Sequence, residues 1–383
     1  MTAALLTPRL RLACGLLLAG TLSACSIFSS STAPKPAPLE NLSAQATQSA
    51  GRVLWQARQD GARFPLSMVV RGDLLVVASD DGIVQALRVA DGSVAWRGEA
   101  GGKLSAGVGS DGRYAAVITR NNELVTLDAG KPLWRKPLSS TVSTAPLVAG
   151  ERVFVLTVDR QVQAFDALDG RRLWDLRRPG DPLTLSQPGV IAAYKDTLVV
   201  GQGARLAGVD PLRGTLRWEA SVANPRGTNE VERLADLVGP LLRVGETLCA
   251  RAFQSAVGCV NAERGSALWS RNTGGIQGVG GDAQHVFGGD GSDRLSAWKT
   301  ANGDLVWTAE QLLNRKLSAP VSVGPYVAVG DFEGYVHFLA RDTGQTRLRL
   351  ATDGSPIVAA PVLAGNTLLV ATRNGGLFAL RVE

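Results

Sequence analysis

The chain has 383 residues, of which 45% are hydrophobic and 19% are charged, a composition typical of a globular protein with one large core or two ordinary ones. Lysine and arginine exceed aspartate and glutamate by only 40 to 34, and this excess is spread along the sequence, which argues against a nucleic-acid partner. The two histidines, His285 and His337, lie far apart, and the four cysteines form no Cys-x-x-Cys pair. The sequence therefore lacks the ligand spacing of a transition-metal site, and we expect both histidines to be half-buried strand residues.

The first 24 residues are predicted to be a signal peptide. Two arginines precede an apolar run at residues 12–20, which is too short to cross a bilayer as a helix. The run is followed by Leu-Ser-Ala-Cys at residues 22–25, which is similar to the lipobox of bacterial lipoproteins. This resemblance implies that Cys25 is lipidated and becomes the new N-terminus, and Ser26, in place of an aspartate, favours the outer membrane. Ordinary secretory cleavage with an incidental cysteine is the alternative.

The stretch after the cysteine is rich in serine, alanine and proline, a composition that cannot bury a core of its own. We expect it to be a flexible tether. The predicted organisation is thus a signal peptide at residues 1–24, a lipidated cysteine and tether at residues 25–50, and a globular domain at residues 51–383.

From residue 51 onward, a Gly-x-x-x-Trp pattern recurs at intervals of 38 to 51 residues, close to the length of a four-stranded propeller blade. Asp-Gly or Asn-Gly pairs at several of these glycines are strong hairpin signals, and each unit carries further apolar strands. We therefore predict an all-β protein, an eight-bladed β-propeller of four-stranded blades whose tryptophans pack between neighbouring blades. The repeated tryptophans are Trp55, Trp96, Trp134, Trp174, Trp218, Trp269 and Trp307, and Leu348 takes the eighth position.

The two ends of the repeat are incomplete in complementary ways. The last unit stops at Glu383, before it reaches its own Trp position, whereas residues 51–55 form a Gly-x-x-x-Trp strand with no blade before it. We expect the first strand to complete the last blade, which closes the ring and leaves no open sheet edge.

A cysteine pair is expected in the fifth unit, because an exported protein folds in a compartment that oxidises thiols. Cys249 and Cys259 lie on two strands that flank a turn near Gln254, so folding of this hairpin sets them opposite each other. We predict a structural disulfide between them; the alternative is two buried thiols in the blade core.

The unit Ala-x-Asp-x-x-x-Gly-x-x-x-Trp resembles the tryptophan-docking repeat of pyrroloquinoline-quinone-dependent alcohol dehydrogenases, which are also eight-bladed propellers. Combined with the lipobox and a length near 380, the sequence resembles the BamB family, the lipoprotein subunits of the outer-membrane β-barrel assembly machine. Three segments carry this likeness further: Leu-Thr-Leu at residues 183–185, Thr-Asn-Glu-Val-Glu-Arg-Leu-Ala-Asp at residues 228–236, and Gly-Asp-Phe-Glu-Gly-Tyr-Val-His at residues 330–337.

The resemblance implies a non-enzymatic scaffold, anchored by lipid on the periplasmic side of the outer membrane. It would bind the periplasmic POTRA domains of the barrel subunit BamA, associate with the other subunits of the complex, and assist the folding and insertion of outer-membrane proteins. Leu183 and Leu185 would be apolar anchors for the POTRA domains, and Arg233 and Asp236 would be polar determinants.

Two departures weaken the expected charge pattern of this surface. Ser186 and the residues after it supply no arginine where the family has one, and Val238 stands where the family has a second acidic residue. From the residues alone, the two leucines could instead pack inward, and the charged pair could hold its own long loop, an insert at about residues 219–240.

Two other functions fit the same fold. A quinone-dependent dehydrogenase would need a Ca²⁺ site, an aspartate base and, in many relatives, adjacent cysteines, and this shorter chain has no adjacent cysteine pair. A periplasmic ligand-binding propeller would be favoured by exposed aromatic platforms, but the chain has only 4 Tyr and 9 Phe, and its tryptophans belong to the repeat. We therefore expect no enzyme activity and no cofactor or metal.

Overall fold

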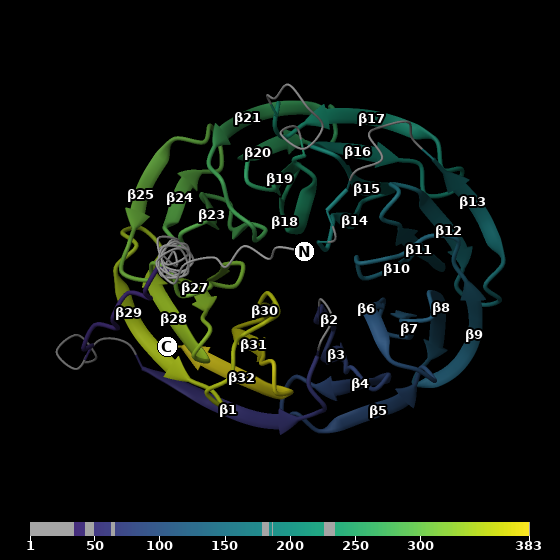
Figure 1. Ribbon diagram of the computed structural model, residues 1–383, viewed down its shortest axis with the longest axis horizontal. Helices are drawn as coiled ribbons and strands as arrows, with labels where there is room; N and C mark the ends of the chain where they lie inside the picture. The colour runs from purple at the N-terminus through teal and green to yellow at the C-terminus, as the bar shows by residue number, and fades with distance from the viewer. Residues whose placement is uncertain are drawn as a thin grey trace, which may run out of the picture. The chain divides into compact units, whose positions relative to one another are not determined.

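The computed structural model describes residues 34–42, 50–62, 66–177, 184–185, 187–225 and 234–382. Within these ranges the regular elements are strands, which form eight four-stranded antiparallel sheets arranged around a ring (Figure 1). This arrangement confirms the predicted eight-bladed β-propeller. The described residues contain no helix with the length and apolar character needed to cross a membrane.

The first four blades follow the chain in order, with the first strand of each blade innermost and the fourth outermost (Figure 1). Blade 1 contains β2 (Val69–Arg71), β3 (Leu74–Ala78), β4 (Ile83–Arg88) and β5 (Val94–Glu99); blade 2 contains β6 (Leu104–Ser110), β7 (Tyr114–Thr119), β8 (Glu123–Asp128) and β9 (Lys131–Pro137); blade 3 contains β10 (Leu147–Ala149), β11 (Arg152–Leu156), β12 (Val162–Asp166) and β13 (Arg172–Leu176); and blade 4 contains β14 (Ile191–Tyr194), β15 (Thr197–Gln202), β16 (Arg205–Val209) and β17 (Leu216–Ser221).

The remaining blades continue this order, except that the last one takes its outer strand from the beginning of the chain. Blade 5 contains β18 (Leu237–Val244), β19 (Thr247–Ala252), β20 (Ala256–Asn261) and β21 (Ser266–Asn272); blade 6 contains β22 (Gly280–Gly281), β23 (His285–Gly289), β24 (Leu295–Lys299) and β25 (Leu305–Ala309); blade 7 contains β26 (Val321–Val323), β27 (Tyr326–Gly330), β28 (Tyr335–Ala340) and β29 (Thr346–Ala351); and blade 8 contains β30 (Val362–Ala364), β31 (Thr367–Ala371), β32 (Gly376–Val382) and β1 (Gly51–Arg58).

The core lies between neighbouring blades. The middle strands are apolar on both faces because each blade is covered on both sides, so β7 is buried along its whole length. The apolar cluster between blades 3 and 4, for example, joins Phe154 and Val162 of one blade to Leu198 and Val209 of the next. Each blade therefore depends on its neighbours for its buried apolar surface.

The repeated tryptophan of each blade packs against the repeated glycine of the next blade. Gly303 has a φ of +73°, and a Cβ at this position would lie 2.5 Å from the indole ring of Trp269, so only glycine leaves room for the ring. The indole N–H of Trp269 donates to the carbonyl of Thr300, in the same turn, at 2.9 Å. The same packing joins Trp55 to Gly92, Trp96 to Gly130, Trp134 to Gly170, Trp174 to Gly214, Trp218 to Gly265, Trp307 to Gly344 and, at the eighth position, Leu348 to Gly51.

The first strand closes the ring as predicted. β1 pairs antiparallel with β32, with Gly51 opposite Val382 and Arg58 opposite Gly376. Trp55 of β1 then packs on Gly92 of blade 1 and donates its indole N–H to the carbonyl of Val89 at 2.7 Å. β1 thus completes the sheet of blade 8, and its Trp55 joins blade 8 to blade 1.

The cysteine pair lies in the middle of blade 5. Cys249 on β19 is directly opposite Cys259 on β20, and the two are joined in a disulfide. Both residues are fully buried, and the indole of Trp269 lies in the same apolar cluster.

Part of the segment expected to be a flexible tether, residues 36–42, belongs to the same compact unit as the propeller. The backbone N–H of Ala37 donates to the carbonyl of Leu313 at 2.9 Å, and Leu39 packs against the apolar cluster between blades 6 and 7. A Pro-rich segment with no core of its own can still dock on a core that the folded domain provides.

Candidate functional site

The candidate site lies on the face that carries the connections between blades and the turns between the second and third strands of each blade, here called the loop face. The connection between β13 and β14 carries Leu185, and the connection between β17 and β18 carries Asp236. Three other residues predicted from the sequence, Cys25, Leu183 and Arg233, lie outside the described residues.

The structure brings Leu185 and Asp236 together although 51 positions separate them. The backbone N–H of Leu185 donates to Oδ2 of Asp236 at 2.9 Å, and the Leu185 side chain is half-buried. The entrances to blades 4 and 5 are therefore joined at one point of the loop face.

The other carboxylate oxygen of Asp236 is bound by a third blade. Arg160, in the turn between β11 and β12 of blade 3, donates from Nη2 to Oδ1 of Asp236 at 2.9 Å. The two side chains are only 19% and 18% exposed, so most of this ion pair is shielded from water. Asp236 thus links blades 3, 4 and 5, whereas the sequence suggested either an ion pair within its own loop or a contact with a partner.

A small cavity of about 50 Å³ lies beside these three residues. Its walls are held by further contacts between connections: Ser143 Oγ donates to the carbonyl of Gln187 at 3.0 Å, and the N–H of Gly189 donates to Oγ1 of Thr144 at 2.8 Å. A cavity of this size can hold a water molecule but is far below the volume of a cofactor pocket. The three connections are therefore braced against one another around a cavity too small for a cofactor.

Comparisons with known proteins give the family. A family model described as outer membrane protein assembly factor BamB matches residues 40–103 and 80–309. The chain is 36% identical over 367 residues to outer membrane protein assembly factor BamB of Bordetella pertussis, with 94% of each chain covered. It is 38% identical over 324 residues to the protein of the same name from Burkholderia pseudomallei, with 84% of this chain and 85% of that chain covered. The chain belongs to the BamB family.

Solved structures agree on the fold. The crystal structure of BamB from Moraxella catarrhalis matches with a TM-score of 0.78 at 24% identity and covers 87% of this chain and all of that one. Quinohemoprotein alcohol dehydrogenase from Comamonas testosteroni matches with a TM-score of 0.64 at 15% identity, covering 90% of this chain and 78% of that chain. At this identity the dehydrogenase shares the propeller fold alone, which is consistent with the resemblance of the tryptophan-docking repeats.

Sequence reasoning about the BamB family missed Arg160, although a signal for it exists. The backbone φ of Arg160 is +61°, a conformation that residues other than glycine, asparagine and aspartate seldom adopt. The turns of blades 1, 2, 6, 7 and 8 with the same backbone hydrogen bond have, at this position, Gly82, Asn122, Asp293, Gly334 and Gly375. Arg160 thus departs from the small residues of these five turns, and its side chain reaches Asp236.

In the described ranges, no group of three or more His, Cys, Asp or Glu side chains lies close enough to hold a metal ion. His285 is half-buried on β23, as expected, whereas His337 on β28 is fully buried and hydrogen-bonded to Asp331 at 2.9 Å, which corrects the expectation of a half-buried residue. Its role is structural.

Proposed function

We propose that this chain is an outer membrane protein assembly factor that acts as a non-enzymatic scaffold. In this proposal, Cys25 is lipidated and holds the protein on the periplasmic side of the outer membrane, and the loop face of blades 3 to 5 binds the POTRA domains of the barrel subunit. Membership of the BamB family supports the proposal, because its relatives carry the name outer membrane protein assembly factor.

The observation that carries the partner surface is the hydrogen bond between Leu185 and Asp236. The family resemblance assigned these two residues to one binding surface, and they come from connections that are far apart in the sequence. Their contact supports a single surface at the entrances to blades 4 and 5.

The two residues have different roles in this proposal. Both carboxylate oxygens of Asp236 are already bound within the chain, so its role is to position the connections. Leu185 is half-buried beside the small cavity and is the apolar contact that a partner would cover. Substitution of Asp236 should then act through the position of Leu185, and substitution of Leu185 should act directly.

The test measures binding of purified POTRA domains of the same organism's barrel subunit to the unlipidated mature chain, residues 25–383 with Cys25→Ser. Leu185→Asp should weaken binding by at least about tenfold, because a carboxylate would have to be desolvated in the contact. Asp236→Asn should weaken it less, since the amide keeps an acceptor for the Leu185 N–H but loses the charge that pairs with Arg160. Calorimetric titration gives both affinities.

A matched control makes the same change at another exposed leucine. Leu305, on the outer strand of blade 6, is 60% exposed and far from the candidate site along the ring, so Leu305→Asp should leave the affinity unchanged. Equal affinities for the parent chain, Leu185→Asp and Leu305→Asp would remove this part of the loop face from the interface. The dehydrogenase alternative has weaker support, because the dehydrogenase structures share only the fold. The ligand-binding alternative has weaker support because the tryptophans belong to the repeat.

A further inference from the structure

The described part of the tether lies against blades 6 and 7, in an extended conformation. Along residues 36–40 the exposure alternates, with Ala37 and Leu39 half-buried and the residues between them exposed. This period of two places one side of the segment on the propeller. Leu39 adds to an apolar cluster that includes Phe287 and Trp307.

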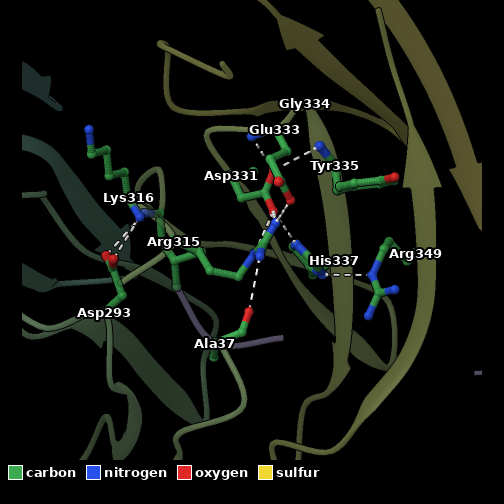
Figure 2. Close-up of polar contacts among 12 residues, drawn as sticks. Ala37, Asp293, Arg315, Lys316, Asp331, Glu333, Gly334, Tyr335, His337 and Arg349 are labelled. Atoms are coloured by element: carbon green, nitrogen blue, oxygen red, sulfur yellow. Dashed lines mark hydrogen bonds and ion pairs between the residues drawn. The ribbon is translucent and has the colours of Figure 1, made fainter. Parts of the chain in front are cut away.

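Two arginines of the propeller hold the tether by its backbone carbonyls. Arg315, in the connection between β25 and β26, donates from Nη1 to the carbonyl of Ala37 at 3.1 Å (Figure 2). Arg349 on β29 donates from Nη1 to the carbonyl of Glu40 at 3.3 Å. The two arginines bind backbone carbonyls, and the side chain that packs on the propeller between them is Leu39. The site therefore recognises an extended segment with an apolar residue between the two bound carbonyls.

The Arg315 side chain is also held by contacts with the propeller itself. It is only 3% exposed, and its guanidinium is bound by Asp331 at 2.7 Å and by Glu333 (Figure 2). Arg349 is likewise oriented, because its Nε donates to Nδ1 of His337 at 3.3 Å and its guanidinium lies over the ring of Tyr335. Preorganised donors lose little freedom when they bind a carbonyl, so these contacts favour a docked tether.

We propose that blades 6 and 7 form a docking site for the protein's own tether and thereby set where the anchored chain leaves the propeller. The membrane part of this proposal rests on the lipidation of Cys25 that we propose above. Ala37 lies twelve positions after Cys25, and a fully extended chain of this length spans about 40 Å. Without docking, the chain would be free as far as Gly51, and its reach would be about 90 Å. Docking therefore shortens the reach of the chain between the lipid anchor and the propeller by more than half. It would hold blades 6 and 7 nearest the membrane.

The docked segment and the candidate partner site share the loop face but lie on different blades, because Arg315 is part of the connection between blades 6 and 7. In Figure 1, blade 3 lies at the right of the ring, blade 4 at the upper right and blade 5 at the top, whereas blades 6 and 7 lie at the left. A short chain between the anchor and blades 6 and 7 would hold these two blades nearer the membrane than blade 3.

The docking itself is tested without lipid, on the mature chain with Cys25→Ser. A Glu-specific endoproteinase cuts after Glu40, and a protease needs several residues on each side of the cut to be free. Leu39→Asp should undock the segment and raise the cleavage rate at least tenfold. Pro38→Asp is the matched control, since residue 38 is exposed and gains the same charge, and should stay close to the parent rate.

Each rate is divided by that of a synthetic peptide of residues 34–46 with the same substitution, which removes the protease's own sequence preference. Substitution of Arg315 is avoided because it would leave Asp331 buried without its cation. A parent chain cut as fast as its peptide would overturn the docking site.

The orientation that docking gives to the propeller is tested on the lipidated full chain, in phospholipid vesicles that carry a headgroup quencher. A fluorophore is attached at Leu305→Cys in blade 6 or at Leu216→Cys in blade 4, both exposed and both two residues before the repeated tryptophan. Quenching should be at least twofold stronger at position 305, and Leu39→Asp should abolish the difference. Equal quenching at the two positions in the parent chain would overturn the proposal that docking holds blades 6 and 7 nearest the membrane. A chain that does not bind vesicles would overturn the lipid anchor instead, and the proteolysis result would still decide the docking.

Discussion

Asp331 is a buried carboxylate at the centre of a polar network on blade 7. It accepts hydrogen bonds from Arg315 and the backbone N–H groups of Glu333 and Tyr335, and it contacts Nε2 of His337 at 2.9 Å (Figure 2). Burial opposes its ionisation, but the hydrogen bonds from His337, the Tyr335 backbone N–H and Arg315 outweigh burial and lower the pKa of Asp331. The carboxylate therefore stays charged and keeps Arg315 in place for the tether.

The network makes stability depend on pH through His337. Burial lowers the pKa of this imidazole below its ordinary value of 6.5, and the nearby Arg349 and Arg315 add to the effect, against the opposing influence of Asp331. As the pH falls through 6.5, the unfolded chain takes up a proton that the folded chain does not, so the folded state loses stability. We expect the free energy of unfolding to fall between pH 7.5 and 5.5 with a slope of at most about 1.4 kcal/mol per pH unit from this residue.

The variant His337→Gln checks this pH dependence, because the amide of glutamine can still donate to Asp331 but does not titrate. Urea unfolding at several pH values should give a shallower dependence for the variant than for the parent chain. The same slope in both proteins would show that other groups cause the dependence.

At the scale of one element, the hairpin between the third and fourth strands carries the contact that joins blades. Its glycine takes a positive φ and lies under the indole of the preceding blade, and the carbonyls of the same turn accept the indole N–H. A single hairpin thus satisfies the backbone geometry, the packing and the hydrogen bonding of the tryptophan. This explains why the Gly-x-x-x-Trp spacing recurs from blade to blade.

The substitution Gly303→Ala tests that contact. Its Cβ would lie 2.5 Å from the Trp269 ring, so we expect a loss of about 2 to 4 kcal/mol in the free energy of unfolding from backbone strain plus overpacking. Gly245→Ala is the matched control, because Gly245 has a φ of +55° and no neighbouring atom within 4 Å of an added Cβ. The control should cost only the strain, about 1 to 2 kcal/mol. Equal losses in calorimetric or urea unfolding would mean that the tryptophan contact contributes little.

At the scale of the whole molecule, closure makes every blade a neighbour of two others. The strand that completes blade 8 comes from the beginning of the domain, so its sheet joins residues more than 300 positions apart. Such a pairing covers the outer edge of β32 and lets each blade be packed between two neighbours.

Closure predicts a sharp difference between two truncations. A chain that starts at residue 50 loses the docked tether but keeps β1, so it should unfold nearly as the parent chain does. A chain that starts at residue 59 loses β1 and Trp55 and should be less stable by on the order of 5 kcal/mol or more, because a buried tryptophan and a full set of strand hydrogen bonds are lost. Thermal unfolding compares the two, and similar melting temperatures would contradict closure by β1.

The sequence by itself determined the repeat architecture. The Gly-x-x-x-Trp spacing, the Asp-Gly turns and the incomplete first and last units predicted eight four-stranded blades closed by the first strand, and the hairpin near Gln254 placed Cys249 opposite Cys259. These features follow from local turn chemistry and from a periodicity that every blade repeats, so they can be read without knowing where the blades lie in space.

Only the tertiary structure decided which connections meet on the loop face and what the tether touches. Arg160 and Asp236 are 76 positions apart, and Ala37 and Arg315 are 278 apart, and neither pair belongs to the repeat. Composition suggested a flexible tether, because a Pro-rich segment cannot form a core alone. The apolar cluster that Leu39 contacts is formed by residues of blades 6 and 7, so it exists only once these blades have packed together. Contacts of this kind depend on the closed ring, which brings distant connections side by side and which no local sequence pattern encodes.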